Sequence, residues 1–401
     1  MTTAETTTTP TTATTQPIVI IGAGLSGLVL ARVLHVHGIE AAVYDLEVSR
    51  EARAQGGMLD IHEDTGQDAL RAAGLHEQFL AKVNPGGEAM RILDKHAVVR
   101  RDEVDDGQGG RPEIDRGDLR EILLDSLPAG VIRWGAKATD VKLVDGQYKI
   151  AFADDSVVTT DLLVGGDGAW SRVRPLLSDA KPAYSGISFV ELDLVDADVR
   201  HPECAKLVGG GSFLALGDHK GFLAHRETDG SLHVYCAVRV EESWLGGIDF
   251  ADPAAGKAAL LGQFADWAPE LRRLVEDADG ALIPRHISAL PIGHTWERAS
   301  AVTLLGDAAH LMSPFAGEGA NLAMIDGADL GRAIAAHPGD IAKALAVYEA
   351  QMFPRAERMA RESAEGLETI FSDRAPEPVV EMFAGFDAAA AAAAAAAEGE
   401  G

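Results

Sequence analysis

The chain has 401 residues, of which 47% are hydrophobic and 24% are charged, and its formal net charge is −27 at pH 7. This length allows two domains, and the composition is that of an ordinary globular protein. So acidic a chain excludes a nucleic-acid partner, which needs a basic surface, and no apolar run approaches the roughly 20 residues of a transmembrane helix, so we expect no integral membrane association.

The cysteines and the first residues bear on the compartment. Cys204 and Cys236 are too few for a disulfide framework, so two buried free thiols are favoured over a single bridge. No basic residue precedes the first apolar segment, which argues against a secretory signal. We therefore expect a cytoplasmic protein, and a monomer or weak dimer.

Both ends of the chain have biased composition. Residues 1–16 are mostly threonine and cannot bury enough apolar surface to fold, so they predict a disordered tail. Residues 373–401 form a second predicted tail, which contains the ten alanines Ala388–Ala397. Alanine is the best helix former, so this run fits a helix, but it indicates no function.

The first ordered elements form a β-α-β unit. The apolar "IVIIGAG" reads as a buried strand, Leu25–His37 as a helix and "AAVYDLE" as a second strand. The glycines permit a tight turn and close approach of the backbone to a pyrophosphate, which the amino end of the helix attracts. The residues of this predicted phosphate-binding turn are Gly22, Gly24, Leu25, Ser26 and Gly27.

An acidic residue is expected at the end of the second strand, where it binds ribose hydroxyls. Asp45 stands at that place. The alternative is a glycine turn that serves packing alone, which strand, helix and acid together disfavour. The motif by itself leaves NAD and FAD both open.

The elements that follow predict an inserted second domain. Residues 117–127 form a helix, 131–164 contain short strands, and 181–245 alternate as strands with turns, in the manner of an antiparallel sheet. "AVTLLGDAAH" returns to a buried strand followed by a helix, and residues 340–371 carry a long amphipathic helical pattern. We predict an α/β fold: a Rossmann-type FAD-binding domain, an inserted, mostly antiparallel β-sheet substrate domain and a long C-terminal helix. The predicted boundaries are 17–180 and 285–335 for the FAD-binding domain, 181–284 for the substrate domain and 336–372 for the bridging helix.

The segment "TLLGDAAHLMSPFAGEGAN" favours FAD. A buried strand delivers Gly306 and Asp307 to a strand end, where Asp307 is suited to accept hydrogen bonds from a polyol. The amino end of the following helix would stabilise the negative charge of a reduced flavin. His310 is interpreted as a structural histidine at a helix start, and the thirteen histidines show no metal-binding spacing, so we expect no metal.

These segments carry a family resemblance. GAGLSG, "DLLVGGDGAWSRVR" and "LLGDAAHLMSPFAGEGAN" resemble, in order and spacing, the three fingerprints of the class A (para-hydroxybenzoate-hydroxylase-like) FAD-dependent monooxygenases. "REARAQGGMLDIHEDTGQDALRAAGL" and "PEIDRGDLREILLDSL" resemble most closely the tetracycline-inactivating branch. The resemblance covers residues 17 to about 371.

The resemblance implies contacts to FAD, in addition to those of the glycine motif. Arg53 and Arg116 taken alone read as surface cations, and only the motif context favours the cofactor. Asp167 and Gly168 belong to a motif linked to both FAD and the nicotinamide donor. The implied contacts are Asp45, Arg53, Gly56, Gly57, Arg116, Asp167, Gly168, Asp307, Pro314, Gly317, Gly319 and Ala320.

The resemblance also implies the reaction. NADH or NADPH reduces the flavin, O2 adds at flavin C4a, and the resulting hydroperoxide hydroxylates or Baeyer–Villiger oxidises a small, polycyclic or polyketide-like natural product. The cofactor carries the chemistry, so we expect no catalytic side chain, and no GxSxG occurs. Matching positions suggest a substrate site lined by Glu191, Phe213, His233, Tyr235, Phe315 and Ile370, closed by Phe371. For His233, a core histidine is the alternative.

Two positions depart from the branch. Glu191 and Tyr235 stand where the tetracycline-inactivating enzymes have glutamine and glycine, and a ring in place of glycine must reshape the pocket. Leu46 replaces an arginine associated with the nicotinamide donor, and leucine cannot pair with a phosphate, so a strong preference for NADPH is not expected.

The segment "GGMLDIH" is predicted to be a strand over the cofactor, with Met58, Asp60 and His62 on one face. Two other functions remain open at this point. One is a flavin-dependent reductase or dehydrogenase of a natural-product pathway, and the other is a non-catalytic flavoprotein that binds a small molecule.

Overall fold

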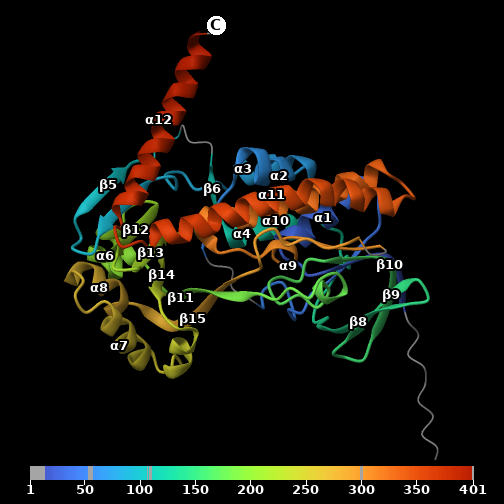
Figure 1. The fold of residues 1–401 in the computed structure, drawn as a ribbon, viewed down its shortest axis with the longest axis horizontal. Helices are drawn as coiled ribbons and strands as arrows, with labels where there is room; N and C mark the ends of the chain where they lie inside the picture. The colour runs from blue at the N-terminus through green and yellow to red at the C-terminus, as the bar shows by residue number, and fades with distance from the viewer. Residues whose placement is uncertain (1–13, 53–56, 106, 108–110, 299–300, 400–401) are drawn as a thin grey trace, which may run out of the picture.

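The computed structural model describes residues 14–52, 57–105, 107, 111–298 and 301–399. Two sheets form the two halves of the molecule, and the long helix α11 (Ile341–Ile370) runs along both of them (Figure 1). The predicted α/β class is therefore confirmed, with one half built on a sheet that has a parallel centre and a second, mostly antiparallel half.

The first sheet has the strand order β7-β2-β1-β10-β9-β8. Strand β16 also pairs with β10, at residues 163–165, whereas β9 pairs with residues 157–160 of the same strand. Strands β2, β1, β10 and β16 run parallel. The strands are β1 (Thr14–Ile21), β2 (Ala42–Tyr44), β7 (Ile132–Arg133), β8 (Ala138–Val144), β9 (Gln147–Phe152), β10 (Val157–Gly165) and β16 (Val302–Leu304). Strand β1 begins at Thr14, three residues before the predicted start at residue 17 and inside the segment predicted as a tail, because Thr14 and Thr15 already pair with β10.

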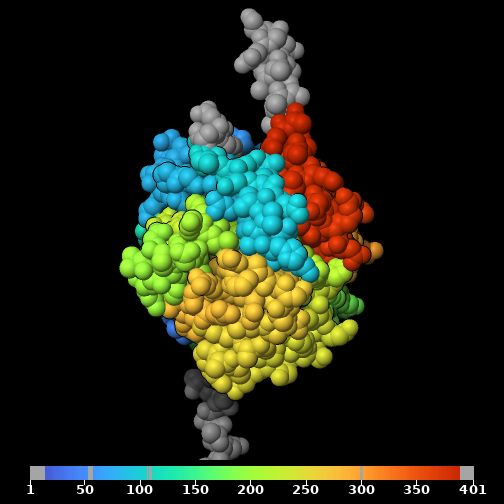
Figure 2. All heavy atoms as spheres, turned by 90° about the vertical axis from the view of Figure 1, so that its left-hand side faces the viewer, coloured from blue at the N-terminus to red at the C-terminus, as the bar shows by residue number. Residues whose placement is uncertain are grey.

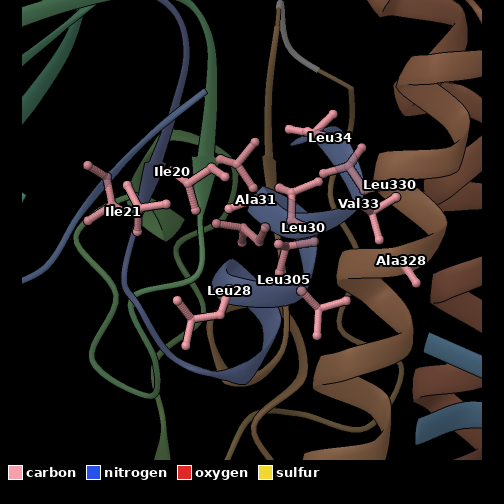
Figure 3. Packing of buried hydrophobic residues seen from close by; sticks show 14 of the residues in the cluster. Ile20, Ile21, Leu28, Leu30, Ala31, Val33, Leu34, Leu305, Ala328 and Leu330 are labelled. Atoms are coloured by element: carbon pink, nitrogen blue, oxygen red, sulfur yellow. The ribbon is translucent and has the colours of Figure 1, made fainter. Parts of the chain in front are cut away.

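Helices α1 (Leu25–Val36) and α10 (Gly319–Ala336) pack on this sheet and on each other, and α4 (Arg116–Asp125) lies beside α1. Figure 3 shows how Leu28, Leu30 and Leu305 fill the space between strands and helices. The two helices touch at glycine: a Cβ on Gly327 would lie 2.4 Å from the Ser26 carbonyl oxygen. This contact fixes the amino end of α1 relative to α10.

A two-stranded ribbon connects the halves. Strands β3 (Met58–Asp60) and β6 (Glu113–Asp115) pair antiparallel. One π-helical turn, η1 (Glu63–Gln67), and the short helices α2 (Asp68–Ala72) and α3 (His76–Leu80) follow β3. The predicted strand in "MLDIH" is therefore present, although it ends at Asp60.

The second sheet has the order β15-β11-β14-β13-β12-β4-β5, in which only β12 and β4 pair in parallel. Its strands are β4 (Met90–Asp94), β5 (Val99–Glu103), β11 (Ala183–Leu194), β12 (Ser212–Gly217), β13 (Lys220–Arg226), β14 (Leu232–Arg239) and β15 (Asp279–Ala289). The predicted boundaries differ from this: β4 and β5 precede the predicted insert, and β15 runs past residue 284. The β4–β5 pair and β15 join the two ends of this sheet through hydrogen bonds to β12 and β11, which are distant in the sequence, and a local sequence pattern does not show such pairing.

Each face of the second sheet has its own apolar cluster. The outer face is covered by α5 (Ala197–Arg200), α6 (Pro202–Val208), η3 (Glu242–Gly247), α7 (Pro253–Gln263) and α8 (Pro269–Glu276). Figure 2 looks onto this end of the molecule, with α7 and α8 in yellow and orange. The other face, called the inner face below, packs against the ends of α11 and α12 and meets the turn η4 (Pro314–Ala316).

The C-terminal prediction is partly corrected. Helix α11 lies within the predicted 336–372, but residues after 372 are not a tail, because α12 (Glu377–Gly399) follows. Val379 of α12 is buried in the inner-face cluster, and Arg101 of β5 contacts Asp387. Cys204 and Cys236 are both buried and free, as predicted. No helix of the described residues is long and apolar enough to cross a membrane.

Candidate active site

The predicted motifs meet at one edge of the first sheet. Gly22 follows β1, Asp45 follows β2, Asp167 comes two residues after the end of β10, and Asp307 comes three residues after the end of β16. Because these strands are parallel neighbours, their carboxyl ends converge. Ligands of open α/β sheets bind at such an edge.

The three glycines of the turn have different tasks. Gly22 has φ +107°, and a Cβ there would lie 2.2 Å from the Gly166 carbonyl oxygen. A Cβ on Gly27 would lie 2.1 Å from the Gly22 carbonyl oxygen. At Gly24 a Cβ would meet nothing within 4 Å. Gly22 and Gly27 therefore hold the turn together, whereas Gly24 leaves open space at the amino end of α1, where a phosphate is favoured.

Asp45 braces this turn. Its Oδ2 accepts the Ala23 N–H at 2.5 Å and its Oδ1 accepts the Glu47 N–H at 2.8 Å. Ser26 is buried and packs beneath the turn. A Cβ added at Gly166 or at Gly306 would lie 3.3 Å from the Ser26 hydroxyl oxygen. Leu25 is half-buried against the same core. Leu46 is 61% exposed beside Asp45 and offers no charge to a ligand.

Asp167 and Asp307 both carry carboxylates with unusual surroundings. Asp167 Oδ2 accepts the Arg172 N–H at 2.6 Å, while Oδ1 is buried without a hydrogen-bond partner among the described residues. Desolvation raises the pKa of Asp167. It also raises the pKa of Asp307, although Asp307 is reached by solvent. Asp307 is thus an exposed carboxylate that has protein packed close to it.

His310 lies one turn further, in α9 (Asp307–His310). Its Nε2 is 2.6 Å from Asp326 Oδ2, which also accepts the Gly306 N–H at 3.0 Å. The paired carboxylate raises the pKa of the His310 imidazole against the effect of burial. The pair ties α10 to the end of β16, which is a structural task.

The turn at η4 and the start of α10 present open backbone. Pro314 and Gly317 are exposed, and Gly317 has φ +68°. Gly319 opens α10, and a Cβ there would meet nothing within 4 Å. Ala320 is half-buried behind it. The amino end of α10 is thus free to face an anion.

His62 joins this turn to β3. Its Nε2 is 2.9 Å from Asp60 Oδ2 and its Nδ1 is 3.1 Å from Glu318 Oε1. Asn321 accepts the His62 N–H and donates to the Asp60 carbonyl oxygen, each at 2.9 Å. Burial opposes the charge, but the two carboxylates raise the pKa of His62 to about 9. Glu318 Oε2 is buried with no hydrogen-bond partner among the described residues. We name Asp60, His62, Glu318 and Asn321 the His62 clamp.

Gly57 is held from both halves. Its N–H donates to Glu227 Oε1 at 2.6 Å, and its carbonyl oxygen accepts the Arg116 N–H at 3.0 Å. Tyr235 Oη lies 3.4 Å from the position of a Cβ on Gly57. The Arg116 guanidinium acts electrostatically on Asp307 and on Tyr235, one residue from each half. Arg53 and Gly56 lie outside the described residues.

The inner face carries a polar row next to the ribbon. Glu191 and Asp193 of β11 pair in register with Tyr235 and His233 of β14. Glu191 binds Arg285 of β15 at 2.6 and 3.3 Å. Burial, with Glu191 and Glu227 close by, raises the pKa of Tyr235 to about 12, so the phenol stays neutral.

An aromatic row continues the inner face toward α11. Phe315 of η4 contacts Phe189 of β11 at a centroid distance of 5.8 Å and Phe371 at 5.2 Å. Ile370 is buried beside them. Phe213 does not lie on the inner face but is fully buried in the outer-face cluster. The strand register explains this, because Leu214, and not Phe213, aligns through Leu223 with Tyr235. We therefore leave Phe213 out of the substrate site.

A pocket of about 200 Å³ lies next to the inner-face cluster, between β15, Met312, Ser313 and α11. Only Glu368 in its lining is ionisable. The convergent donors and acceptors, which mark a site more clearly than volume does, lie at the strand ends and the inner face. Among the described residues, no group of His, Cys, Asp and Glu is arranged to hold a metal ion.

The profile of the family described as "FAD binding domain" matches residues 15–363. The chain belongs to this family. The members of this family are class A flavin monooxygenases, so the chain is an FAD-dependent oxidoreductase. The monooxygenase penA of Penicillium thymicola is 32% identical in an alignment 423 positions long, which covers 90% of this chain and 97% of penA.

Solved structures of low identity share the fold of this flavoprotein. Klebsiella pneumoniae HpxO, in complex with FAD and uric acid, superposes with a TM-score of 0.76 at 22% identity and covers 92% of both chains. The tetracycline destructase Tet(51) superposes with a TM-score of 0.71 at 19% identity, over 92% of this chain and 94% of its own. The family match confirms the resemblance to the class A FAD-dependent monooxygenases that was drawn from the sequence.

The strand-end edge of the flavoprotein fits FAD. Gly24 and Gly319 leave backbone open, Asp307 is an exposed acceptor, and Asp167 Oδ1 and Glu318 Oε2 are buried acceptors that lack a protein donor among the described residues. Sequence reasoning missed Glu318, Asp193, Glu227 and Arg285, each of which acts through a partner distant in the chain. The only local signal was the polar alternation of "FVELDL" and "SLHVYC".

Proposed function

We propose that this flavoprotein is a monooxygenase that uses NADH or NADPH and O2 to oxygenate a small, polycyclic or polyketide-like natural product. The contact of Phe315 with Phe189 supports this most directly, because the turn that we expect to border the flavin packs against the inner face of the second sheet. A ligand on that face would lie beside the cofactor.

FAD would be held by the glycine turn, Asp45, Asp167, Asp307 and the start of α10, with Gly57 and Arg116 on the side of the ribbon. When bound, FAD supplies electron transfer from the nicotinamide donor and oxygen transfer to carbon. The protein orients the substrate and excludes water, and the amino end of α10 favours negative charge on the cofactor.

The inner face suggests the shape of the substrate. Phe189, Phe315 and Phe371 would contact a flat apolar part, and Tyr235 and His233 a polar part. Tyr235 fills space against Gly57, so a substrate narrower than tetracycline is expected. Exposed Leu46 gives no phosphate contact, so we expect NADH and NADPH to serve comparably.

The test is oxidation of NADH and NADPH by the purified holoenzyme across a panel of aromatic polyketides, with mass spectrometry of the products. We expect substrate-stimulated oxidation and one oxygen atom added to a product. Stimulated oxidation with a reduced and never an oxygenated product would instead indicate the reductase. Ligand binding without any stimulation would indicate a binding flavoprotein.

A further inference from the structure

The polar row of the inner face contains an imidazole held by a carboxylate. His233 Nδ1 lies 2.6 Å from Asp193 Oδ1, and the two residues face each other in register on β14 and β11. The side chain of His233 is 10% exposed, while that of Asp193 is 52% exposed. His233 is therefore at the inner end of the pair and Asp193 at its solvent end.

This hydrogen bond decides which ring nitrogen of His233 is available. A carboxylate accepts only, so the Nδ1 hydrogen points to Asp193. No hydrogen bond to Nε2 is found among the described residues. The ring stands edge-on to Tyr235 at a centroid distance of 4.7 Å. Nε2 is consequently left for a ligand.

The charge around His233 comes from several elements. Asp193 and Glu191 stand on β11, Glu227 on the turn between β13 and β14, and Tyr235 on β14 itself. His225 of β13 pairs in register with His233 and is 2.7 Å from Glu113. Burial disfavours the imidazolium, but Asp193, Glu227 and Glu191 together raise the pKa of His233.

The exposed half of the pair adds little to stability. An ion pair with one partner half in solvent is screened and contributes weakly to folding. Its clearer effect is on the ring, whose orientation and charge it fixes. This is the arrangement expected of a recognition group rather than of a core histidine.

We propose that Asp193 is a positioning residue that holds the His233 imidazole so that Nε2–H donates to an ionised oxygen, an enolate or phenolate, of the substrate. This rests on the proposed function, because it places the substrate on the inner face. A negatively charged oxygen makes the adjoining carbon electron-rich, which suits electrophilic oxygenation.

The first test is NMR of the full-length holoenzyme with ¹⁵N-labelled histidine, in which His233→Gln identifies the His233 signals. We expect Asp193→Asn to lower the pKa of His233 by about one unit or more. The matched control is Asp373→Asn, which removes a carboxylate 2.8 Å from His219, a histidine at the β12–β13 turn. That variant should leave His233 unchanged. An unmoved His233 in Asp193→Asn overturns the positioning role.

The second test is binding of 4-nitrophenol and its methyl ether, 4-nitroanisole, without NADH, NADPH or turnover. The wild type should bind 4-nitrophenol as the coloured phenolate, and Asp193→Asn and His233→Gln should weaken it about tenfold or more, with little change for 4-nitroanisole. The preference should fade as the pH rises through the pKa of His233, because the imidazolium is lost.

The inference is overturned if the wild type and Asp193→Asn bind 4-nitrophenol with equal affinity. It is also overturned if neither protein binds 4-nitrophenol detectably. Equal losses for both probes would do so too, since they would indicate a change of shape alone. Because no turnover is involved, this failure is distinct from that of the proposed function. A protein that binds the phenolate selectively but never oxygenates a substrate contradicts only the proposed monooxygenase activity.

Discussion

The cofactor edge of the first sheet and the inner face of the second sheet are built by different means. The edge is made largely of backbone: Gly22 and Gly27 allow chain segments to touch, and Gly24 and Gly319 leave open space. The inner face is made of side chains paired across strands, such as Glu191 with Arg285 and Asp193 with His233. Backbone requirements restrict the edge to a few residue types, whereas side-chain pairs allow the face to vary with substrate.

The largest expected effect lies at the edge. Gly22→Ala would place a Cβ 2.2 Å from the Gly166 carbonyl oxygen at φ +107°, which we expect to cost about 3 kcal/mol or more and to abolish FAD binding. The matched control is Gly24→Ala, whose Cβ meets nothing, so the apoprotein should lose about 1 kcal/mol or less while FAD affinity falls. Chemical denaturation and FAD titration measure both. If the two variants were equally stable, backbone contact would not define the edge.

Phe213 and Phe315 separate packing from ligand contact on the second sheet. Phe213→Ala should cost about 3 to 5 kcal/mol of unfolding free energy because Phe213 is fully buried, with ligand affinity little changed. Phe315→Ala should cost less, because Phe315 is half-buried, but should weaken ligand binding. Thermal unfolding and ligand titration of the folded fraction check this pair. The reverse ranking would place the substrate on the outer face.

The His62 clamp predicts a pH dependence at the border between the two regions. A raised pKa means that the folded state binds the proton more tightly, so the stabilisation is complete below about pH 6.5 and is lost as the pH rises through about 9. The shift corresponds to at most about 3 kcal/mol. The unfolding free energy of the wild type should fall relative to that of His62→Gln between pH 6.5 and 9.5. Parallel curves for the two proteins would show that His62 is not held as a cation.

The smallest effect is expected at the rim of the inner face. Glu191→Gln weakens the bond to Arg285, whose side chain is 44% exposed, so the unfolding free energy should change by about 1 kcal/mol or less. The substrate specificity, measured as kcat/KM across the panel, should nevertheless change, because Arg285 becomes free to bind anionic substrates. An unchanged ranking of substrates would place this pair outside the site.

The sequence predicted the cofactor edge better than the inner face. The reason is that the edge is built from backbone, whereas the inner face is built from side chains paired across strands. The sequence predicted GAGLSG, Asp45 and "LLGD" as parts of the site because local geometry sets where glycines and acidic residues stand relative to a strand. The orientation of Phe213 depends on the register between β12, β13 and β14, and a shift of one residue exchanges the faces. Glu318, which binds His62, and Glu227, which binds Gly57, are each more than 150 residues away along the chain, so no local pattern could have indicated them.

Titration of FAD into apoprotein tests the central claim, that the strand-end edge holds the cofactor beside the inner face. The account predicts one FAD bound per chain, affinity at least about tenfold weaker in Asp307→Ala, and no change in Asp154→Asn, which alters an exposed turn of the same sheet. Absence of FAD binding, or equal affinity of Asp307→Ala and the wild type, would contradict it.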